Sequence, residues 1–296
     1  MNKKINQICQ QINCEDILAH KFYPVWFFSN EKISNFFQKV EDHQEIKRVF
    51  SIAGGGDFAF SVLATKSLNQ ISEVNVCDIR QMASVTIDFK LALFKNLSYQ
   101  EILNLFLERK FFDKWQTYRK LEKIITPLTK IIFDSILKKY KKNDFLKCLK
   151  KSGLWYRDSF WQIKNKKEYF PYLVSEARYR LLQQNLAKIS IYCGDFRENL
   201  NLFQKNYFNL IYISNILDSK EYCQESNLYL KAIREKLEQN GLLFVVTQNN
   251  SSKMIKLIEK QGFSIYKKEL PKFNPISLFL GHYAYSFLLF QKNQDT

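Results

Sequence analysis

The stretch Arg48–Ser61, RVFSIAGGGDFAFS, decides how the rest of the chain is interpreted. Val49–Ala53 is a short, mainly apolar run, which is typical of a buried strand. A turn of three glycines follows it: Gly54, Gly55 and Gly56. Asp57 then precedes a second apolar run, Phe58–Ala64, and this order predicts a helix with Asp57 as its N-cap. Glycines let a ligand approach the backbone closely and a helix start offers free N–H groups, so the stretch predicts either a nucleotide site or a plain tight turn.

The next apolar segment favours the nucleotide site. Val74–Asp78 follows the glycines after about twenty residues and predicts a second strand with a carboxylate at its C-terminal tip. In a doubly wound sheet, an acid in this place binds the hydroxyls of a ribose. The glycine turn and Asp78 together therefore point to a nucleotide more strongly than the turn does alone.

Composition and charge limit the class of protein. With 296 residues, 46% of them hydrophobic, the chain can form one large α/β domain or two small ones. Its 45 basic and 29 acidic residues give a formal charge of +16. Such an excess suggests an anionic partner, whether nucleic acid, lipid headgroups or a charged small molecule. The alternative is a lysine-rich composition whose charge only keeps the protein solvated.

The cysteine and hydropathy patterns indicate neither a metal site nor a transmembrane segment. The six cysteines are scattered without a Cys-x-x-Cys pair and there are only three histidines, so we predict no metal site. The segment Met1–Cys14 is polar, and no apolar run reaches transmembrane length. We therefore expect a cytoplasmic protein with reduced thiols.

The pattern along the chain predicts three parts. Residues 1–47 are expected to form a helical, aromatic lead-in that packs in the core or closes over a ligand as a lid. Residues 48–97 and 187–296 alternate strands and helices and form the predicted ligand-binding domain. Residues 98–186 are predicted to be a helical insertion, which is strongly basic because 109–151 contain fourteen Lys/Arg and four Asp/Glu. We expect this basic surface to meet an anionic membrane or RNA.

The C-terminal half completes the predicted sheet. We expect strands at 189–193, 208–213, 242–247, 263–269 and 283–291, with the last two forming an antiparallel hairpin. Ligands bind at the carboxyl ends of strands in such sheets. Besides the glycine turn and Asp78, those ends hold Asp195 with Phe196, and Ser214 with Asn215.

A mostly parallel, seven-stranded sheet with a terminal antiparallel hairpin resembles the Rossmann-like fold of class I S-adenosylmethionine-dependent transferases. The resemblance implies that Asp78 takes the ribose hydroxyls beside Ile79, and that Asp195 takes the adenine amino group beside the Phe196 backbone. For Asp195, the alternative is a helix N-cap. The resemblance makes the following cofactor-binding candidates: Ser51, Ala53, Gly54, Gly55, Gly56, Asp57, Asp78, Ile79, Asp195, Phe196, Ser214 and Asn215.

The glycine turn departs from the usual methyltransferase pattern, with Ser51 in place of its first acid and Asp57 in place of its last glycine. Five stretches, 51–57, 76–79, 89–92, 97–102 and 105–106, resemble the S-adenosylmethionine:diacylglycerol 3-amino-3-carboxypropyltransferase family of betaine-lipid synthesis. Tyr23 and Trp26 are similar to an aromatic segment upstream in that family and are substrate-binding candidates. Its acidic continuation is absent here, where Phe27 and Phe28 follow.

This resemblance implies transfer of the 3-amino-3-carboxypropyl group to a lipid or small molecule, with methylthioadenosine released. Asp57 would then bind the ammonium group and Arg157 the carboxylate, or Asp57 would be a simple N-cap. Asp218 and His20 are the candidate catalytic bases. Two alternatives stay open: a methyltransferase, acting on RNA or a small molecule, and a degenerate fold that binds without chemistry.

Overall fold

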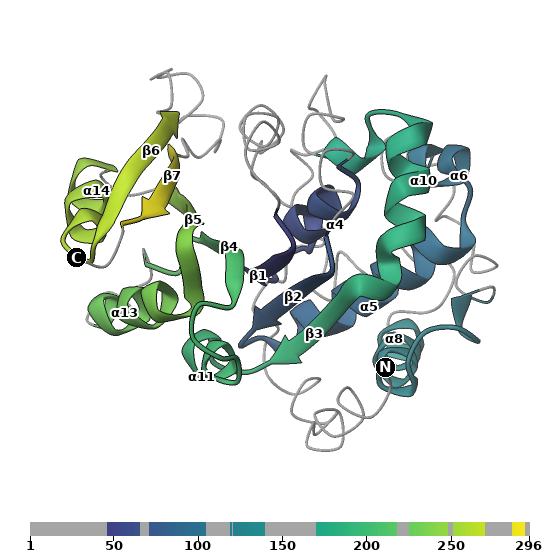
Figure 1. Cartoon of the computed structure of the whole chain (residues 1–296). Helices are drawn as coiled ribbons and strands as arrows, with labels where there is room; N and C mark the ends of the chain where they lie inside the picture. The colour runs from purple at the N-terminus through teal and green to yellow at the C-terminus, as the bar shows by residue number, and fades with distance from the viewer. Residues whose placement is uncertain are drawn as a thin grey trace, which may run out of the picture.

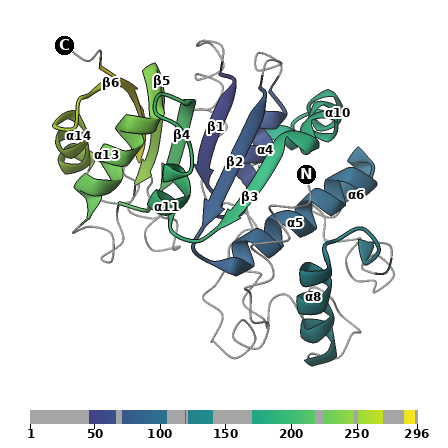
Figure 2. The same cartoon turned by 60° about the horizontal axis from the view of Figure 1, so that its bottom comes forward.

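The structure is a computed structural model and describes residues 46–65, 71–104, 119, 121–139, 170–217, 225–247, 251–269 and 286–293. A central sheet carries helices on both faces, as the two views in Figure 1 and Figure 2 show. The predicted α/β class is therefore confirmed. No helix within the described ranges is both long and apolar enough to cross a membrane.

The sheet has seven strands in the order β3-β2-β1-β4-β5-β7-β6. Their bounds are β1 (Arg48–Ile52), β2 (Glu73–Asp78), β3 (Ile189–Cys193), β4 (Phe208–Ser214), β5 (Leu237–Thr247), β6 (Phe263–Glu269) and β7 (Ser286–Lys292). The first five strands pair in parallel, whereas β7 is antiparallel to both β5 and β6. This confirms the predicted terminal hairpin and a mostly parallel sheet. The apolar runs of β4 and β5 are buried because helices cover both faces.

Ten helical elements surround the sheet in the described ranges. They are α4 (Asp57–Leu63), α5 (Gln81–Asn96), α6 (Tyr99–Leu103), α8 (Pro127–Lys139), η5 (Pro171–Leu173), α10 (Glu176–Asn185), η6 (Leu186–Lys188), α11 (Phe196–Asn201), α13 (Ser226–Lys236) and α14 (Ser251–Glu259). Helices α4, α5, α8 and α10 contribute to one apolar core, and α11, α13 and α14 contribute to the other. The sheet therefore separates two apolar cores.

The described parts of segment 98–186 share the first core. The Tyr179 hydroxyl of α10 donates to the carbonyl oxygens of Phe94 and Leu97, at 3.1 and 2.8 Å. On α8, the Phe133 ring stacks on Phe89 of α5, with centroids 4.4 Å apart. These contacts attach α8 and α10 to the sheet domain. The predicted bounds of the insertion remain a prediction, and much of its basic stretch lies outside the described residues.

One predicted boundary was displaced. The strand expected over 242–247 begins earlier, at Leu237, because α13 ends at Lys236 and Leu237 already pairs with Phe208 of β4. The pairing then shifts, so that Leu242 stands opposite Leu210. Asn240, with φ of 64°, lies within this irregular part. The sequence Asn240-Gly241, a pair typical of turns, therefore lies at an irregularity inside a strand.

Candidate functional site

The predicted ligand residues meet at the carboxyl edge of the sheet. In the parallel register, Ile52 of β1 stands opposite Cys77 of β2, and Asp78 stands opposite Cys193 of β3. Strand β4 pairs with the other side of β1. The four segments that follow these strands therefore emerge side by side, which is where open α/β sheets bind their ligands.

The Asp78 carboxylate is fixed by backbone donors. Its Oδ2 accepts a hydrogen bond of 3.1 Å from the Gly54 N–H, and its Oδ1 accepts one of 2.9 Å from the Arg80 N–H. The side chain is nearly buried, with the residue 8% exposed. Burial raises the pKa of Asp78, and the two backbone donors and the Arg80 charge oppose that rise. Because a carboxylate has about four acceptor sites, these bonds leave room to accept ligand hydroxyls.

Gly54 and Gly56, the first and third glycines of the turn, differ in what surrounds them. Both have a left-handed backbone, with φ of 48° at Gly54 and 79° at Gly56. A Cβ added to Gly54 would meet nothing within 4 Å, whereas one on Gly56 would lie 2.8 Å from the Phe60 ring and 3.0 Å from Ile87. Gly56 therefore allows helix packing. Gly54 faces open space, which suits close approach of a ligand to the backbone.

Asp57 has a different role from the predicted one. The N-cap of α4 is Gly56, and Asp57 is the first helical residue. Its Oδ1 accepts hydrogen bonds from the Lys90 ammonium at 3.0 Å and from the Tyr172 hydroxyl at 2.6 Å. The side chains of Asp57 and Lys90 are both fully buried. The N-cap prediction was wrong because this buried pair takes the carboxylate into the core.

The buried cluster of Asp57, Lys90 and Tyr172 also supports the glycine turn. The Lys90 ammonium donates to the Gly55 carbonyl oxygen at 2.7 Å, so one cation joins the turn and Asp57 to helix α5. Burial lowers the pKa of Lys90, and the Asp57 charge opposes that change. Burial also raises the pKa of Tyr172 well above its usual value, which keeps the hydroxyl protonated as a donor. The cluster therefore holds the turn in one position.

Sequence reasoning assigned no role to Lys90 or Tyr172. A lysine between Phe89 and Leu91, in a helix otherwise rich in apolar residues, was the available signal. A lysine is rarely fully buried unless it is paired. Its partner could not be identified, because Asp57 lies 33 positions away and Tyr172 is 115 positions from Asp57.

After the third strand, Asp195 does act as a helix cap. Its Oδ1 accepts a hydrogen bond of 3.0 Å from the Glu198 N–H at the start of α11, and its Oδ2 accepts one of 2.5 Å from the Tyr229 hydroxyl. The Phe196 side chain is buried and its ring packs edge-on against Phe50, with centroids 5.1 Å apart. The alternative of a helix cap is thus confirmed, and contact of Asp195 with adenine remains a prediction.

Ile79 is an exposed apolar side chain beside the fixed carboxylate. It directly follows Asp78 and is 55% exposed, although it lies at the end of a buried strand. Exposed branched aliphatic side chains bury apolar area when a flat ring covers them. This position therefore suits packing against a base whose ribose is bound by Asp78.

Three further cofactor-binding candidates, Ser51, Ser214 and Asn215, lie on β1 and at the end of β4. Ser51 is 1% exposed within β1, and its hydroxyl has no hydrogen-bond partner among the described residues. Ser214 ends β4, and its hydroxyl accepts a hydrogen bond of 3.1 Å from the Asn215 amide. Asn215 has a left-handed backbone, with φ of 55°, and its N–H donates to the Val246 carbonyl oxygen. These three residues shape the edge between β1 and β5.

Five predicted residues lie outside the described part of the chain. They are the candidate bases His20 and Asp218 and the candidate substrate residues Tyr23, Trp26 and Arg157. Their roles therefore stay predictions.

The strand order, with β7 antiparallel between β5 and β6, defines the Rossmann-like fold of class I methyltransferases. No protein-family model matches the chain, and no curated protein matches it. Among solved structures, it is similar to the N-methyltransferase NodS from Bradyrhizobium japonicum WM9 (TM-score 0.42, 7% identity, 88% of this chain and 93% of that one). It is also similar to the rRNA methyltransferase aviRa from Streptomyces viridochromogenes (TM-score 0.43, 9% identity, 89% and 85% covered).

A third similar structure is the [4+2]-cyclase SpnF (TM-score 0.41, 10% identity, 88% of this chain and 81% of that one covered). All three likenesses are too distant to assign an activity. The fold assignment rests on the strand order itself.

Proposed function

We propose that the protein is an S-adenosylmethionine-dependent transferase. The observation that carries the proposal is the Asp78 carboxylate, which is fixed by the N–H groups of Gly54 and Arg80 at the carboxyl edge of a class I sheet. A carboxylate in this position is suited to a ribose diol. The ribose hydroxyls would donate to Asp78, the adenine would pack on Ile79 near Asp195, and the methionine part would cross the open face of Gly54.

For the group transferred, we propose 3-amino-3-carboxypropyl, with a lipid or small molecule as the acceptor. The support is the resemblance of these sequence stretches to the betaine-lipid enzymes, together with two contacts that join three of the stretches in space. Gly54 binds Asp78, and Asp57 pairs with Lys90. The aspartate that replaces the usual glycine is thus matched by a buried lysine, which makes the altered turn a coherent unit.

The buried pair changes the roles within this proposal. Since Lys90 and Tyr172 occupy the Asp57 carboxylate, we assign Asp57 to supporting the turn and no longer to binding the ammonium group. Transfer then depends on which carbon of the sulfonium lies in line with the nucleophile, at about 3–3.5 Å. His20 or Asp218 would serve as the base for a hydroxyl acceptor.

Methyl transfer is the second candidate, because the same edge could bind the cofactor with its methyl group in line. The class I sheet order favours it as much as the first. RNA and small molecules are the acceptors that this alternative includes, given the formal charge of +16.

The position of a radiolabel in the cofactor separates the two reactions. The protein would be incubated with diacylglycerol in mixed micelles, and separately with RNA, using cofactor labelled either on its methyl or on its carboxyl carbon. Aminocarboxypropyl transfer moves only the carboxyl label to the acceptor and releases methylthioadenosine. Methyl transfer moves only the methyl label and releases S-adenosylhomocysteine.

Heat-inactivated protein is the control for spontaneous breakdown of the cofactor. Label from the carboxyl carbon in the lipid fraction is the result that the proposal predicts. Label from the methyl carbon in any acceptor would overturn aminocarboxypropyl transfer in favour of the second candidate.

A further inference from the structure

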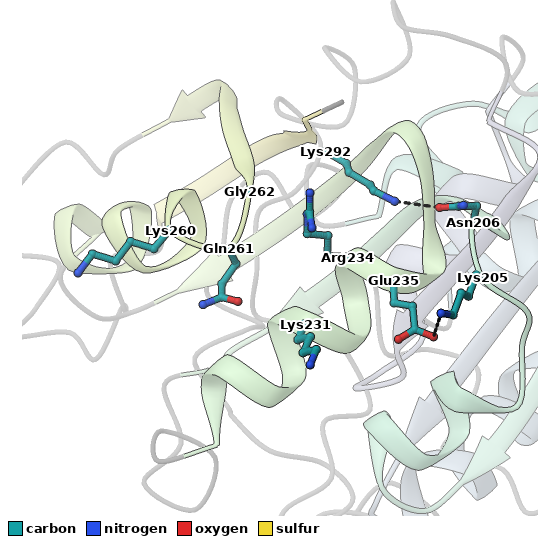
Figure 3. Close-up of a pocket in the computed structure, with 9 residues that line it drawn as sticks. All are labelled: Lys205, Asn206, Lys231, Arg234, Glu235, Lys260, Gln261, Gly262 and Lys292. Carbon is teal, nitrogen blue, oxygen red and sulfur yellow. Dashed lines mark hydrogen bonds and ion pairs between the residues drawn. The ribbon is translucent and has the colours of Figure 1, made fainter. Parts of the chain in front are cut away.

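A pocket of about 610 Å³ lies at the amino-terminal edge of the sheet, opposite the candidate cofactor site. Its walls come from the segment before β4, the end of α13, the end of α14 and the end of β7 (Figure 3). Because β7 runs antiparallel, its last residues reach the edge where β4 and β5 begin. The pocket therefore joins four segments that are far apart in the sequence and shares no residue with the other edge.

The charge of the pocket is strongly one-sided. Five cationic side chains and one carboxylate line it: Lys205, Lys231, Arg234, Lys260, Lys292 and Glu235. The carboxylate of Glu235 is already shared by Lys205 at 4.0 Å and Lys236 at 3.4 Å. The lining thus has an excess of four positive charges, which concentrates anions in a recess more than on an open surface.

Two of the cations are held in place by their surroundings. Lys292 is 4% exposed, and its ammonium donates to Asn206 Oδ1 and to the Leu237 carbonyl oxygen, each at 2.9 Å (Figure 3). The Arg234 guanidinium lies against the backbone of Gly262, where an added Cβ would come within 2.7 Å of its Nε. Glycine, with φ of 82° there, allows this contact. The inner wall is therefore preorganised, whereas Lys231 and Lys260 are exposed at the rim.

The helix ends around the pocket determine how an anion would be bound. Helices α13 and α14 both finish here, so they direct carbonyl oxygens and the negative ends of their dipoles towards it. These ends stabilise the cations but offer no N–H donors to an anion. An anion must then be bound by side chains, and ammonium and guanidinium groups are the usual partners of phosphate oxygens.

From this charge, size and preorganisation, we propose that the pocket binds a phosphate-bearing anion with several negative charges. The volume exceeds the need of one phosphate group and suits a chain of phosphates, either free or within a nucleic acid backbone. The proposal does not depend on the chemistry at the carboxyl edge.

Calorimetric titration with inorganic tripolyphosphate tests the proposal directly. We expect the wild type to bind it, with affinity falling as ionic strength rises. The rim variant Lys231→Glu/Lys260→Glu should bind roughly a hundredfold more weakly, because it loses two charge-assisted contacts that are each worth on the order of a factor of ten. The variant Lys231→Arg/Lys260→Arg should retain binding, since the charge is kept.

The matched control is Lys95→Glu/Lys123→Glu, which changes the net charge equally at exposed lysines that do not line the pocket. Lys95 lies in the last turn of α5, much as Lys260 directly follows the last residue of α14. Equal weakening in both double variants would overturn the site, and so would absence of binding to the wild type. A single-stranded RNA oligonucleotide that displaces tripolyphosphate from the wild type would identify a nucleic acid backbone as the source, and no displacement would identify a free anion.

Discussion

The two edges of the sheet hold charged side chains in different ways. At the carboxyl edge, Asp78 and Asp57 are buried, and each carboxylate accepts at least two hydrogen bonds from groups fixed by the fold. At the amino edge, Lys231 and Lys260 are exposed and extend from helical segments. The first arrangement selects a ligand by the position of its polar atoms, whereas these two rim lysines select mainly by charge. Substitutions that preserve charge but not geometry should therefore harm the carboxyl edge more than the exposed rim of the amino edge.

The largest effect is expected where the buried pair under the glycine turn is broken. Lys90→Met leaves the Asp57 carboxylate buried without its cation, which should lower the free energy of unfolding by roughly 3–5 kcal/mol. Urea unfolding followed by circular dichroism measures this loss. The rim variant Lys231→Glu/Lys260→Glu should change stability by only about 0.5 kcal/mol, because both side chains are exposed.

The double variant Asp57→Leu/Lys90→Met is the control that separates the cost of an unpaired buried charge from the cost of changing the side chains. Because it removes both charges together, it should recover much of the stability lost in Lys90→Met. A Lys90→Met protein as stable as the rim variant would show that the cluster does not support the turn.

A smaller effect should separate two glycines of the same turn. Gly56→Ala places a methyl group against Phe60 and Ile87, so we expect a loss of roughly 1–3 kcal/mol in addition to about 1 kcal/mol for the left-handed backbone. Gly54→Ala has only the backbone cost, since its added methyl meets open space. Thermal unfolding compares the two variants.

Gly56→Ala should be the less stable of these two variants, but Gly54→Ala should be the weaker in cofactor binding when both are measured well below their melting temperatures. In Gly54→Ala the methyl group enters the space assigned to the ligand, so this variant should bind S-adenosylmethionine more weakly than Gly56→Ala. Equal affinities would remove Gly54 from the site.

The sequence predicted the sheet well because its signals are local. The apolar runs and the glycine turn were enough to predict seven strands, the last two of them as a hairpin. The positions of Asp78 and Asp195 at strand ends followed from the same pattern. The wrong N-cap at Asp57 arose because local capping rules cannot anticipate a buried lysine from another helix.

The features that sequence reasoning missed all depend on distant pairing. Tyr229 reaches Asp195 from α13, and Tyr172 reaches Asp57 from η5, although neither has a local motif. The basic pocket has the same origin, because its cations come from four separate segments. Only the fold brings such residues together, so a list of charged residues in the sequence could not predict them.

Calorimetric binding of S-adenosylmethionine to the wild type and to Asp78→Ala tests the central claim most directly. We predict that the wild type binds and that the variant binds more weakly by roughly 1–3 kcal/mol, because a polar ligand group loses its partner. Asp134→Ala, an acid on α8 far from β2 in the sequence, should leave the affinity unchanged, and circular dichroism would verify that both variants fold. Absence of binding to the wild type, or an unchanged affinity in folded Asp78→Ala, would contradict the assignment of the carboxyl edge as the cofactor site.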